Sequence, residues 1–446
     1  MRKPWFCVLV VLTVFGLMLS GCGKSESPPP AAKKEAKPAE KPAVAEPAKK
    51  AAGGVREVVI GFTSSQTGKL NVEATRQING VTLWMDQVNA AGGVKLPDGT
   101  VVKFTAKYYD DESKKERVQE LYTKLINTDK AEFLISPYSS PLAEAAALIA
   151  QQNNRIMLTA GAASDSTYRM GFTLIYQTYT PSSRYLTPAV DVLAKLAPGA
   201  KKVAIVHEKD KFSTDVVKAL DAYAKSKGFE VVLFEGYEPG ATDFAPFINK
   251  IPAGVDAIMG GGHFADTSTF ARQVFEKGVK AKMVALLVAP PEPKFAELGE
   301  AALGVIGPSQ WEPAAKYTPE AAKVLNVEWF GPSINDFTES YKAKFKGEVP
   351  SYHSAGGYVA GLLIQYAIAK AGSVDTQAVK KVLDGCDLAT FYGRLKFDNT
   401  PQNHGLQVGH EMILTQWQKD PQGKLVNQVV YPEAFRTAPT ALYPRN

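Results

Sequence analysis

The sequence is poor in the residues that crosslink a chain or hold a metal cluster. Three of its 446 residues are cysteines, and two of them, Cys7 and Cys22, lie close to the N-terminus. Cys386 is therefore alone in the rest of the chain, where no disulfide can form. The five histidines, at positions 207, 263, 353, 404 and 410, lack the close spacing of a zinc site. We expect no metal site and no cofactor.

The sequence also lacks a strong excess of one charge. It has 51 Lys and Arg residues against 45 Asp and Glu residues, a formal net charge of +6. Six of the lysines fall between residues 33 and 50, so the remainder carries little net charge. No basic face interleaved with aromatic residues is readable there. These features argue against binding to nucleic acid.

Motifs of the common catalytic sites are missing as well. The segment TGKL at 67–70 lacks the upstream glycine and the Ser or Thr of a phosphate loop. The segment GGGHFADTS at 260–268 lacks the spaced glycines of a dinucleotide site. There is no G-x-S-x-G sequence, and His410 with Glu411 lacks the second histidine of a zinc-binding helix. We therefore expect a protein that is not an enzyme.

The N-terminal segment is typical of an exported protein. Arg2 and Lys3 precede an apolar run, and small residues precede Cys22, which is the pattern of a secretory signal peptide. The sequence LSGC resembles the bacterial lipobox, whose cysteine is lipidated. A transmembrane anchor is the alternative, but the run is shorter than the ~20 residues that a spanning helix needs. We predict a lipoprotein signal peptide over 1–21 and lipidation of Cys22.

Residues 22–54 are predicted to form a disordered tether rich in Lys, Pro and Ala. From residue 23 onward this segment has no aromatic residue, and Val44 is its only larger aliphatic one. Such a composition cannot bury enough apolar surface to offset the entropy lost on ordering. At ~3.3 Å per residue the segment reaches at most ~100 Å. It would let a globular body move above the membrane.

The rest of the sequence alternates short β-branched runs with helical apolar periodicity. After the run at 57–62, for example, Val81, Trp84, Met85 and Val88 have the i, i+3, i+4, i+7 spacing of a helix. This alternation predicts parallel sheets covered on both faces, and it restarts after residue 202. We predict an α/β fold of two lobes. The expected strands are 57–62, 103–109, 132–136, 155–160, 202–207, 229–234, 255–262 and 282–288, with later helices near 333–345, 353–371 and 375–384.

Two hydroxyl-rich segments follow neighbouring strands of the first lobe. Ser139 and Ser140 stand at the start of an alanine-rich helix, where free backbone N–H groups and a partial positive charge suit a carboxylate. The segment 159–166 ends the next strand with small residues, so backbone groups and the hydroxyls of Ser164 or Ser166 can approach a ligand. The alternatives are a serine that merely caps its own helix and a flexible turn with incidental serines.

Several spaced segments resemble those of one protein family. They are SQTGKLNVEATRQINGVTLWMDQVNAAGGV, YYDDES, SPYSSPLAEAAA, IMLTAGAAS, VAIVHEKDKFSTD, GATDFAPFINKI, HSAGGYVAGLLIQYAI and FYGRLKF. Over nearly all of residues 55–440 the chain resembles the type I periplasmic solute-binding proteins of ABC importers. The branch it resembles serves leucine, isoleucine, valine and related small molecules.

The resemblance implies two Rossmann-like lobes with parallel-rich sheets that are joined by a three-segment hinge and close on a ligand. Members hold the ligand's carboxylate at positions matched here by Ser140, Ala162 and Ser164, and Tyr138 and Ser139 belong to the same segment. The implied lobes are 55–180 with 308–404, and 181–307 with 405–446.

Other positions depart from the family pattern. Glu73 stands where members often have Tyr or Phe, His263 where an aromatic residue is expected, and Phe212 where a tyrosine is expected. The acid that pairs with an amino acid's ammonium has no aligned match, since Glu292 lies further along. Glu73 either replaces that acid or is a solvated helix residue, and His263 either contacts ligand or is structural.

These observations predict an extracytoplasmic, lipid-anchored solute-binding protein of an ABC importer. It would capture a small carboxylate-bearing solute, a branched-chain or related amino acid, by hinge closure. Its partners would be that solute, the membrane through the lipid, and the importer's permease and ATPase subunits. We expect a monomer. The alternatives are an aromatic acid or an amide or urea-type ligand on the same fold, and a ligand-sensing receptor component.

Overall fold

The computed structural model describes residues 53–444. These residues belong to one compact unit, whose fold is given below. The predicted signal peptide, Cys22 and the predicted tether up to residue 52 lie outside the described residues. Within residues 53–444, no helix combines the length and the apolar character needed to cross a bilayer.

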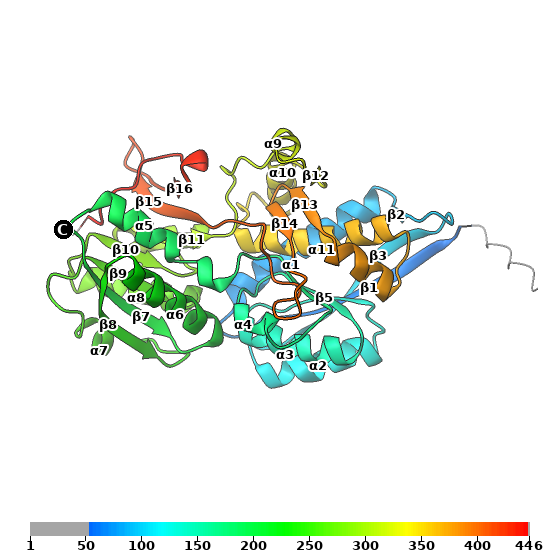
Figure 1. The fold of residues 1–446 in the computed structure, drawn as a ribbon, viewed down its shortest axis with the longest axis horizontal. Coiled ribbons are helices and arrows are strands. Elements are labelled where there is room, and N and C mark those ends of the chain that lie inside the picture. Colours follow the sequence, from blue (N-terminus) through cyan, green and yellow to red (C-terminus); the bar gives the residue numbers. More distant parts are fainter. Residues whose placement is uncertain (1–52, 445–446) are drawn as a thin grey trace, which may run out of the picture. The chain divides into compact units, whose positions relative to one another are not determined.

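The first lobe is built on a six-stranded sheet with the strand order β2-β3-β1-β4-β5-β6 (Figure 1). All neighbouring pairs are parallel except β2 with β3. Every residue of the central strands β4 and β5 is buried, as expected for strands covered on both faces. The strands are β1 (Val55–Ser64), β2 (Val94–Lys95), β3 (Val101–Asp110), β4 (Phe133–Ile135), β5 (Ile156–Thr159) and β6 (Ile175–Gln177).

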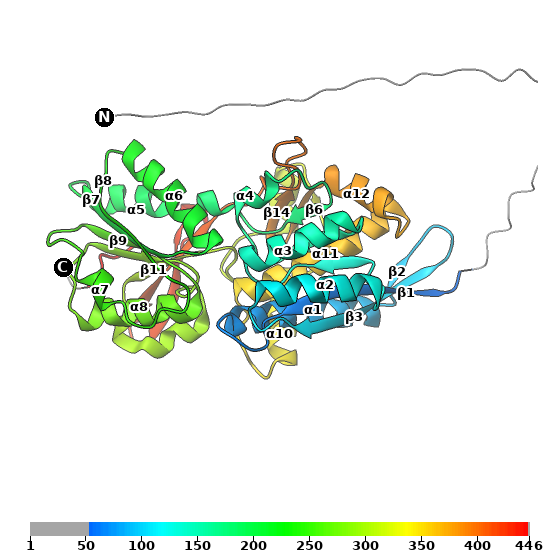
Figure 2. The same ribbon diagram turned by 90° about the horizontal axis from the view of Figure 1, so that it is seen from below.

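Helices connect these strands, because a parallel pair needs a crossover. Helices α2 and α3 pack together on one face of the sheet, and α1 packs with α11 on the other (Figure 1 and Figure 2). A later part of the chain adds a small three-stranded sheet to this lobe. The elements are α1 (Asn71–Ala90), α2 (Lys115–Asn127), α3 (Ser140–Gln152), α4 (Asp165–Tyr168), α9 (Pro319–Val324), β12 (Glu328–Trp329), α10 (Ile334–Lys344), α11 (Tyr352–Ala371), α12 (Thr376–Asp384), β13 (Asp387–Thr390) and β14 (Gly393–Lys396).

The second lobe is built on a seven-stranded sheet with the order β16-β15-β11-β10-β9-β7-β8. Strands β7 to β11 run parallel, whereas β15 and β16 are antiparallel additions from the end of the chain, drawn in red beside the green lobe (Figure 1). The strands are β7 (Lys202–Glu208), β8 (Glu230–Tyr237), β9 (Ala257–Gly261), β10 (Met283–Leu286), β11 (Val305–Ser309), β15 (Ile413–Lys419) and β16 (Leu425–Tyr431).

The helices of the second lobe follow the same alternation with its strands. The helix that connects β8 to β9, α7, is a single turn. Asp243 accepts a hydrogen bond from Ala245 N where the turn begins, and Pro252 follows its end. The elements are η1 (Ser182–Arg184), α5 (Thr187–Leu196), α6 (Lys211–Ser226), α7 (Ala245–Ile248), α8 (Phe264–Glu276), η2 (Pro293–Ala301) and η3 (Glu433–Phe435).

The chain passes between the two sheets after β6, after β11 and before β15. The predicted boundary between residues 307 and 308 falls inside β11, which stays paired with β15 up to Ser309. The lobe boundaries drawn from the sequence otherwise stay predictions. The predicted fold class, two parallel-rich α/β lobes, agrees with the two sheets.

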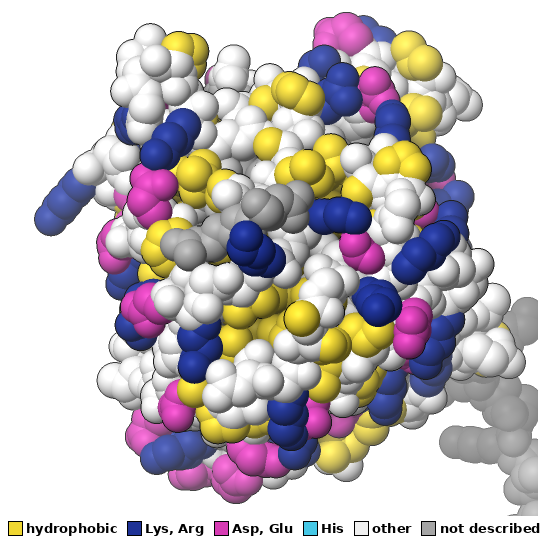
Figure 3. Space-filling model, turned by 90° about the vertical axis from the view of Figure 1, so that its left-hand side faces the viewer, with side chains coloured by type: hydrophobic (Ala, Val, Ile, Leu, Met, Phe, Trp, Pro, Cys, Tyr) yellow, Lys and Arg dark blue, Asp and Glu magenta, His cyan; other side chains and the backbone are white. Residues whose placement is uncertain are grey.

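On the end of the second lobe, charges of both signs are interspersed. Figure 3 shows Lys and Arg side chains among Asp and Glu side chains, with hydrophobic side chains between them. This face therefore does not present a continuous basic surface.

Helices α1 and α11 approach closely because glycines lie at their contact. Helix α11 is buried almost all round, as expected for a helix that is apolar on every side. A Cβ atom added at Gly357 would lie 2.0 Å from the carbonyl oxygen of Gln77, and one at Gly80 would lie 1.9 Å from the carbonyl oxygen of Ser354. A side chain at either position would push backbone against backbone.

We therefore expect Gly357→Ala to lower the free energy of unfolding by ~1–3 kcal/mol, because overpacking outweighs the gain in helix propensity. Urea unfolding measures this loss. Gly385→Ala is the matched control, since its nearest neighbouring atom is 3.7 Å from the added Cβ. An equal loss in both variants would contradict close packing of α1 on α11.

Candidate functional site

The two hydroxyl-rich segments lie together at the carboxyl edge of the first sheet. Tyr138 to Ser140 join β4 to α3, and Ala162 to Ser164 join the neighbouring strand β5 to α4. The hydroxyl oxygen of Ser140 accepts hydrogen bonds from Ala163 N at 3.1 Å and Ser164 N at 3.2 Å. The sequence prediction that these segments are close in space is therefore correct.

The start of α3 has no side-chain cap. Ser139 occupies the N-cap position, but its hydroxyl makes no capping hydrogen bond. The hydroxyls of Ser139 and Ser164 have no hydrogen-bond partner among the described residues, although the two residues are only 2% and 1% exposed. Buried hydroxyls of this kind are costly unless another group pairs with them. The geometry thus disfavours the alternative that Ser139 merely caps its own helix.

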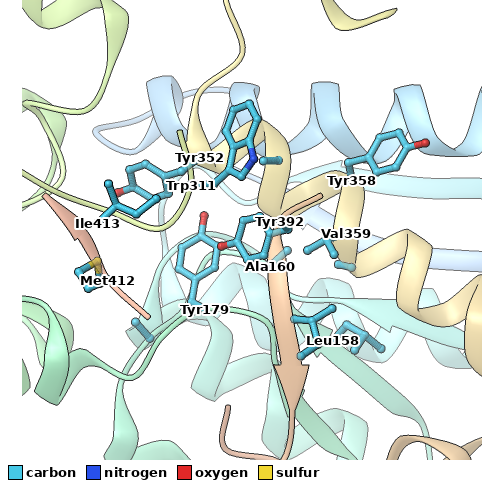
Figure 4. Close-up of a cluster of buried hydrophobic side chains, with 14 of the residues drawn as sticks. Leu158, Ala160, Tyr179, Trp311, Tyr352, Tyr358, Val359, Tyr392, Met412 and Ile413 are labelled. Carbon is cyan, nitrogen blue, oxygen red and sulfur yellow. The ribbon is translucent and has the colours of Figure 1, made fainter. Parts of the chain in front are cut away.

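Ser139 and Ser140 border a small cavity between the lobes with largely aromatic walls. Its free volume is about 10 Å³, which is roughly the space that one water molecule needs. The rings of Tyr179 and Tyr352 lie 5.8 Å apart, and Tyr179 also stacks on Tyr392, as Figure 4 shows. The hydroxyl of Tyr179 has no partner among the described residues. The lining residues are Tyr138, Ser139, Ser140, Gly161, Ala163, Tyr179, Tyr185, Phe212, His263, Val288 and Tyr352.

Side chains of the first lobe reach helix α8 of the second lobe across this cavity. Glu73 is fully buried, and its Oε1 accepts a hydrogen bond at 2.9 Å from the N–H of Phe264, the first residue of α8. Its Oε2 has no hydrogen-bond partner among the described residues. The hydroxyl of Tyr138 lies 2.9 Å from Nδ1 of His263. Glu73 is therefore not a solvated helix residue.

His263 lies among several carboxylates. Its Nε2 is 2.9 Å from Asp210 Oδ2 and 3.7 Å from Glu208 Oε2. Burial favours the neutral ring, but the Asp210, Glu208 and Glu73 carboxylates outweigh it and raise the pKa of His263 to about 9. Burial and the Glu208 charge also raise the pKa of Asp266 to about 6. At neutral pH His263 is therefore positively charged and is paired with the carboxylates around it.

Glu292 forms a second buried ion pair between the lobes. It follows β10, and its Oε1 lies 2.5 Å from Nδ1 of His353 in α11. Arg76 in α1 is 3.8 Å from its other oxygen. Although burial opposes ionisation, the His353 hydrogen bond and the two positive partners lower the pKa of Glu292. Glu292 is thus already paired by groups of the first lobe.

The structure brings most of the predicted site residues to one place. Tyr138, Ser139, Ser140, Phe212 and His263 line the cavity, Ala162 lies between two lining residues, and Ser164 bonds to Ser140. Sequence reasoning missed the tyrosines of the cavity wall. They come from two distant parts of the chain, and no local pattern distinguishes them from core aromatics. These lining residues are Tyr179, Tyr185 and Tyr352.

The chemistry of the cavity suits binding. One end offers hydroxyl donors and the open start of α3, and the walls are aromatic. Glu73 is not a lining residue, but one of its buried carboxylate oxygens has no hydrogen-bond partner among the described residues. Such an arrangement can hold a molecule that has an anionic end and an apolar or aromatic body.

Comparison with known proteins agrees with this geometry. A family model described as periplasmic binding protein matches residues 57–423. Leu/Ile/Val-binding protein homolog 7 of Brucella melitensis is 26% identical over 398 residues, which cover 86% of this chain and 94% of that protein. Homolog 8 of Brucella abortus is 26% identical over 395 residues, covering 84% and 91%.

Solved structures share the fold. The substrate-binding protein LivJ of Streptococcus pneumoniae, in complex with isoleucine, has a TM-score of 0.68 at 20% identity, with 84% of this chain and 100% of that chain covered. A solute-binding protein of Rhodopseudomonas palustris, in complex with 3,4-dihydroxybenzoic acid, has a TM-score of 0.70 at 21% identity, covering 87% and 99%.

The chain therefore belongs to the periplasmic binding protein family, whose members are extracytoplasmic. The relatives and solved structures named above are solute-binding proteins, several of them for branched-chain amino acids. The resemblance seen in the sequence is confirmed.

The three segments between the lobes meet at Thr180. Its N–H donates to Gln310 Oε1 at 2.7 Å, and its hydroxyl lies 2.7 Å from Nδ1 of His410. Nε2 of His410 lies 2.8 Å from the carbonyl oxygen of Tyr392 and must donate to it, so the neutral ring accepts from Thr180. Burial lowers the pKa of His410 to about 4.

This pKa makes the hinge sensitive to acid. The unfolded chain binds a proton at His410 near pH ~6.5, whereas the folded chain binds it only near pH 4. The stabilisation is therefore complete above the unfolded pKa and is lost as the pH falls toward 4. We expect the unfolding free energy of the wild type, relative to His410→Gln, to fall by about 2–3 kcal/mol between pH 7 and pH 4. Urea unfolding at both pH values measures it, and a pH-independent difference would contradict a neutral buried ring.

Proposed function

We propose that the chain is a lipid-anchored solute-binding protein that captures a small carboxylate-bearing solute by closure of its two lobes. The solute class we favour is a branched-chain or related amino acid. The permease and ATPase subunits of an ABC importer would receive it, and the chain would act as a monomer. Cys22 would carry the lipid, which the LSGC sequence supports.

The open start of α3 is the observation that carries this proposal. Backbone N–H groups at a helix start have no partners within the helix, and the helix dipole favours an anion there. The buried hydroxyls of Ser139 and Ser164 lack partners among the described residues at the same point. A carboxylate seated there would satisfy all of these donors.

Glu73 supports an amino group on the solute. Its Oε1 is engaged by Phe264 N, while its Oε2 is buried without a partner among the described residues. An ammonium group of the solute would pair with this unpartnered carboxylate oxygen. The same contact would couple ligand binding to closure, because Glu73 belongs to the first lobe and Phe264 to the second.

An aromatic acid is the second candidate, and the cavity wall favours it. Aromatic rings of Tyr138, Tyr179, Tyr185, Phe212 and Tyr352 surround the empty space. Such rings stack on an aromatic body as well as they pack against an aliphatic one. The solved relative from Rhodopseudomonas palustris binds 3,4-dihydroxybenzoic acid on the same fold.

A thermal-shift screen of the purified protein tests the proposal, since a ligand that binds only the native chain raises the melting temperature. The set contains branched-chain amino acids, their 2-oxo acid counterparts, hydroxybenzoic acids and neutral amides. We expect a carboxylate-bearing compound to give the largest shift. A larger melting-temperature shift with an amino acid than with its 2-oxo acid would support Glu73 as the ammonium partner. The largest shift with a hydroxybenzoic acid would support the second candidate. A shift with amides alone would contradict the carboxylate site.

The affinity of the Ser139→Ala variant for the solute identified by this screen tests the site itself. Loss of a hydrogen bond to a charged carboxylate should weaken binding by ~1–3 kcal/mol, which calorimetry measures. Ser333→Ala is the matched control, because Ser333 caps the exposed start of α10, outside the cavity. Equal affinity of Ser139→Ala and the wild type would remove Ser139 from the site.

A further inference from the structure

Three side chains able to bind a metal ion converge at one point of the second lobe. Glu208 ends β7, Asp210 precedes α6, and His263 follows β9. Strands β7 and β9 are parallel neighbours, and His207 is paired with Gly261 at their ends. The residues that follow these strands are therefore side by side at the carboxyl edge of the sheet. One ligand atom of each of the three side chains lies within 4.8 Å of the other two.

These separations are close to those of a metal site. Two atoms that bind the same ion at ~2.0–2.2 Å can be at most ~4.4 Å apart. His263 Nε2 is 2.9 Å from Asp210 Oδ2 and 3.7 Å from Glu208 Oε2, so both pairs already meet this limit. Small side-chain rotations would bring all three atoms to bonding distance of one ion.

Glu208 Oε2 is an independent sign that a cation belongs here. The Glu208 side chain is 1% exposed, and this oxygen accepts no hydrogen bond from any described residue. A buried carboxylate oxygen without a donor is costly. It lies 3.7 Å from His263 Nε2 and points into the cluster. An ion bound by the three side chains would satisfy it.

Each of the three side chains is also held through its other polar atom. Side chains that bind metals in proteins commonly have such outer partners, which fix their orientation. Two of these partners come from the first lobe. The contacts are Tyr138 Oη to His263 Nδ1 at 2.9 Å, Ser213 N to Asp210 Oδ1 at 2.7 Å, and Lys69 Nζ to Glu208 Oε1 at 2.6 Å.

We propose that Glu208, Asp210 and His263 form a binding site for one divalent transition-metal ion such as Zn²⁺. One imidazole with two carboxylates suits such an ion, whereas Mg²⁺ and Ca²⁺ favour oxygen ligands alone. An open groove of about 360 Å³, lined in part by Asp210, His263 and Lys69, gives the ion access from solvent.

The proposed metal site is linked to lobe closure but does not rest on the identity of the solute. All three ligands belong to the second lobe, so the site exists before the lobes close. Tyr138 and Lys69 belong to the first lobe and contact the ligands in this structure. A bound ion would orient the His263 ring, so its Nδ1–H would donate to Tyr138. The ion would thereby favour closure.

Metal binding to the purified full chain tests the proposal after dialysis against a chelator. Calorimetry with Zn²⁺, Mn²⁺ and Mg²⁺, and the metal content after removal of free ion, give affinity and stoichiometry. We expect about one Zn²⁺ per chain and at least ~10-fold weaker binding of Zn²⁺ by Glu208→Gln and by His263→Gln. His404→Gln is the matched control, because His404 also pairs with an acid, Asp384 at 2.9 Å, outside the cluster. It should bind Zn²⁺ as the wild type does.

Three results would overturn the proposal. They are no stoichiometric Zn²⁺ binding by the wild type, unchanged Zn²⁺ binding by both Glu208→Gln and His263→Gln, and binding of Mg²⁺ as tight as that of Zn²⁺. If circular dichroism shows that the variants do not fold, the visible absorption spectrum of Co²⁺ added to the wild type tests the proposal instead. Bands distinct from those of aqueous Co²⁺ support a protein site, and the aqueous spectrum refutes it.

Discussion

The site depends on backbone N–H groups at the starts of helices. These helix starts lie on the facing edges of the two parallel-rich sheets, and their N–H groups need hydrogen-bond partners. A helix that follows a parallel strand begins at the edge of the sheet where ligands bind, and its first N–H groups have no partner within the helix itself. In the second lobe, Glu73 of the first lobe meets the first N–H of α8. In the first lobe, α3 begins without a side-chain cap, beside the buried hydroxyls of Ser139 and Ser164. One helix start is thus satisfied by the protein, and the other is left for a solute.

Closure follows from the same polar groups. Lys69 with Glu208, Tyr138 with His263, and Glu292 with His353 join the lobes through buried or half-buried contacts. Each of these contacts contributes only modestly to the free energy of closure. A buried charge without a partner costs free energy, so we expect the closed form to be favoured only when nearly every buried polar group is paired. In the proposed function, a bound solute would complete the pairing at α3. The three segments between the lobes are tied together at Thr180.

The sequence allowed the fold class and half of the cavity to be predicted, because both depend on local patterns. Runs of β-branched residues mark the central strands, and a hydroxyl-rich segment directly after a strand places Ser139 and Ser140 at a ligand edge. The cavity wall depends instead on contacts between distant residues. Tyr179 and Tyr352 look like core aromatics in the sequence, and Glu73 finds its partner Phe264 in the other lobe, 191 positions further along the chain. The short strands β6 and β12 carry too little pattern to be recognised.

The central claim is that the start of α3 holds the anionic group of the solute between closed lobes. A crystal structure of the protein with the solute that binds most tightly tests this claim most directly. The account predicts carboxylate oxygens within hydrogen-bond distance of the Ser139 and Ser164 hydroxyls and of N–H groups at the start of α3. A solute bound elsewhere, or one whose carboxylate faces away from α3, would contradict it.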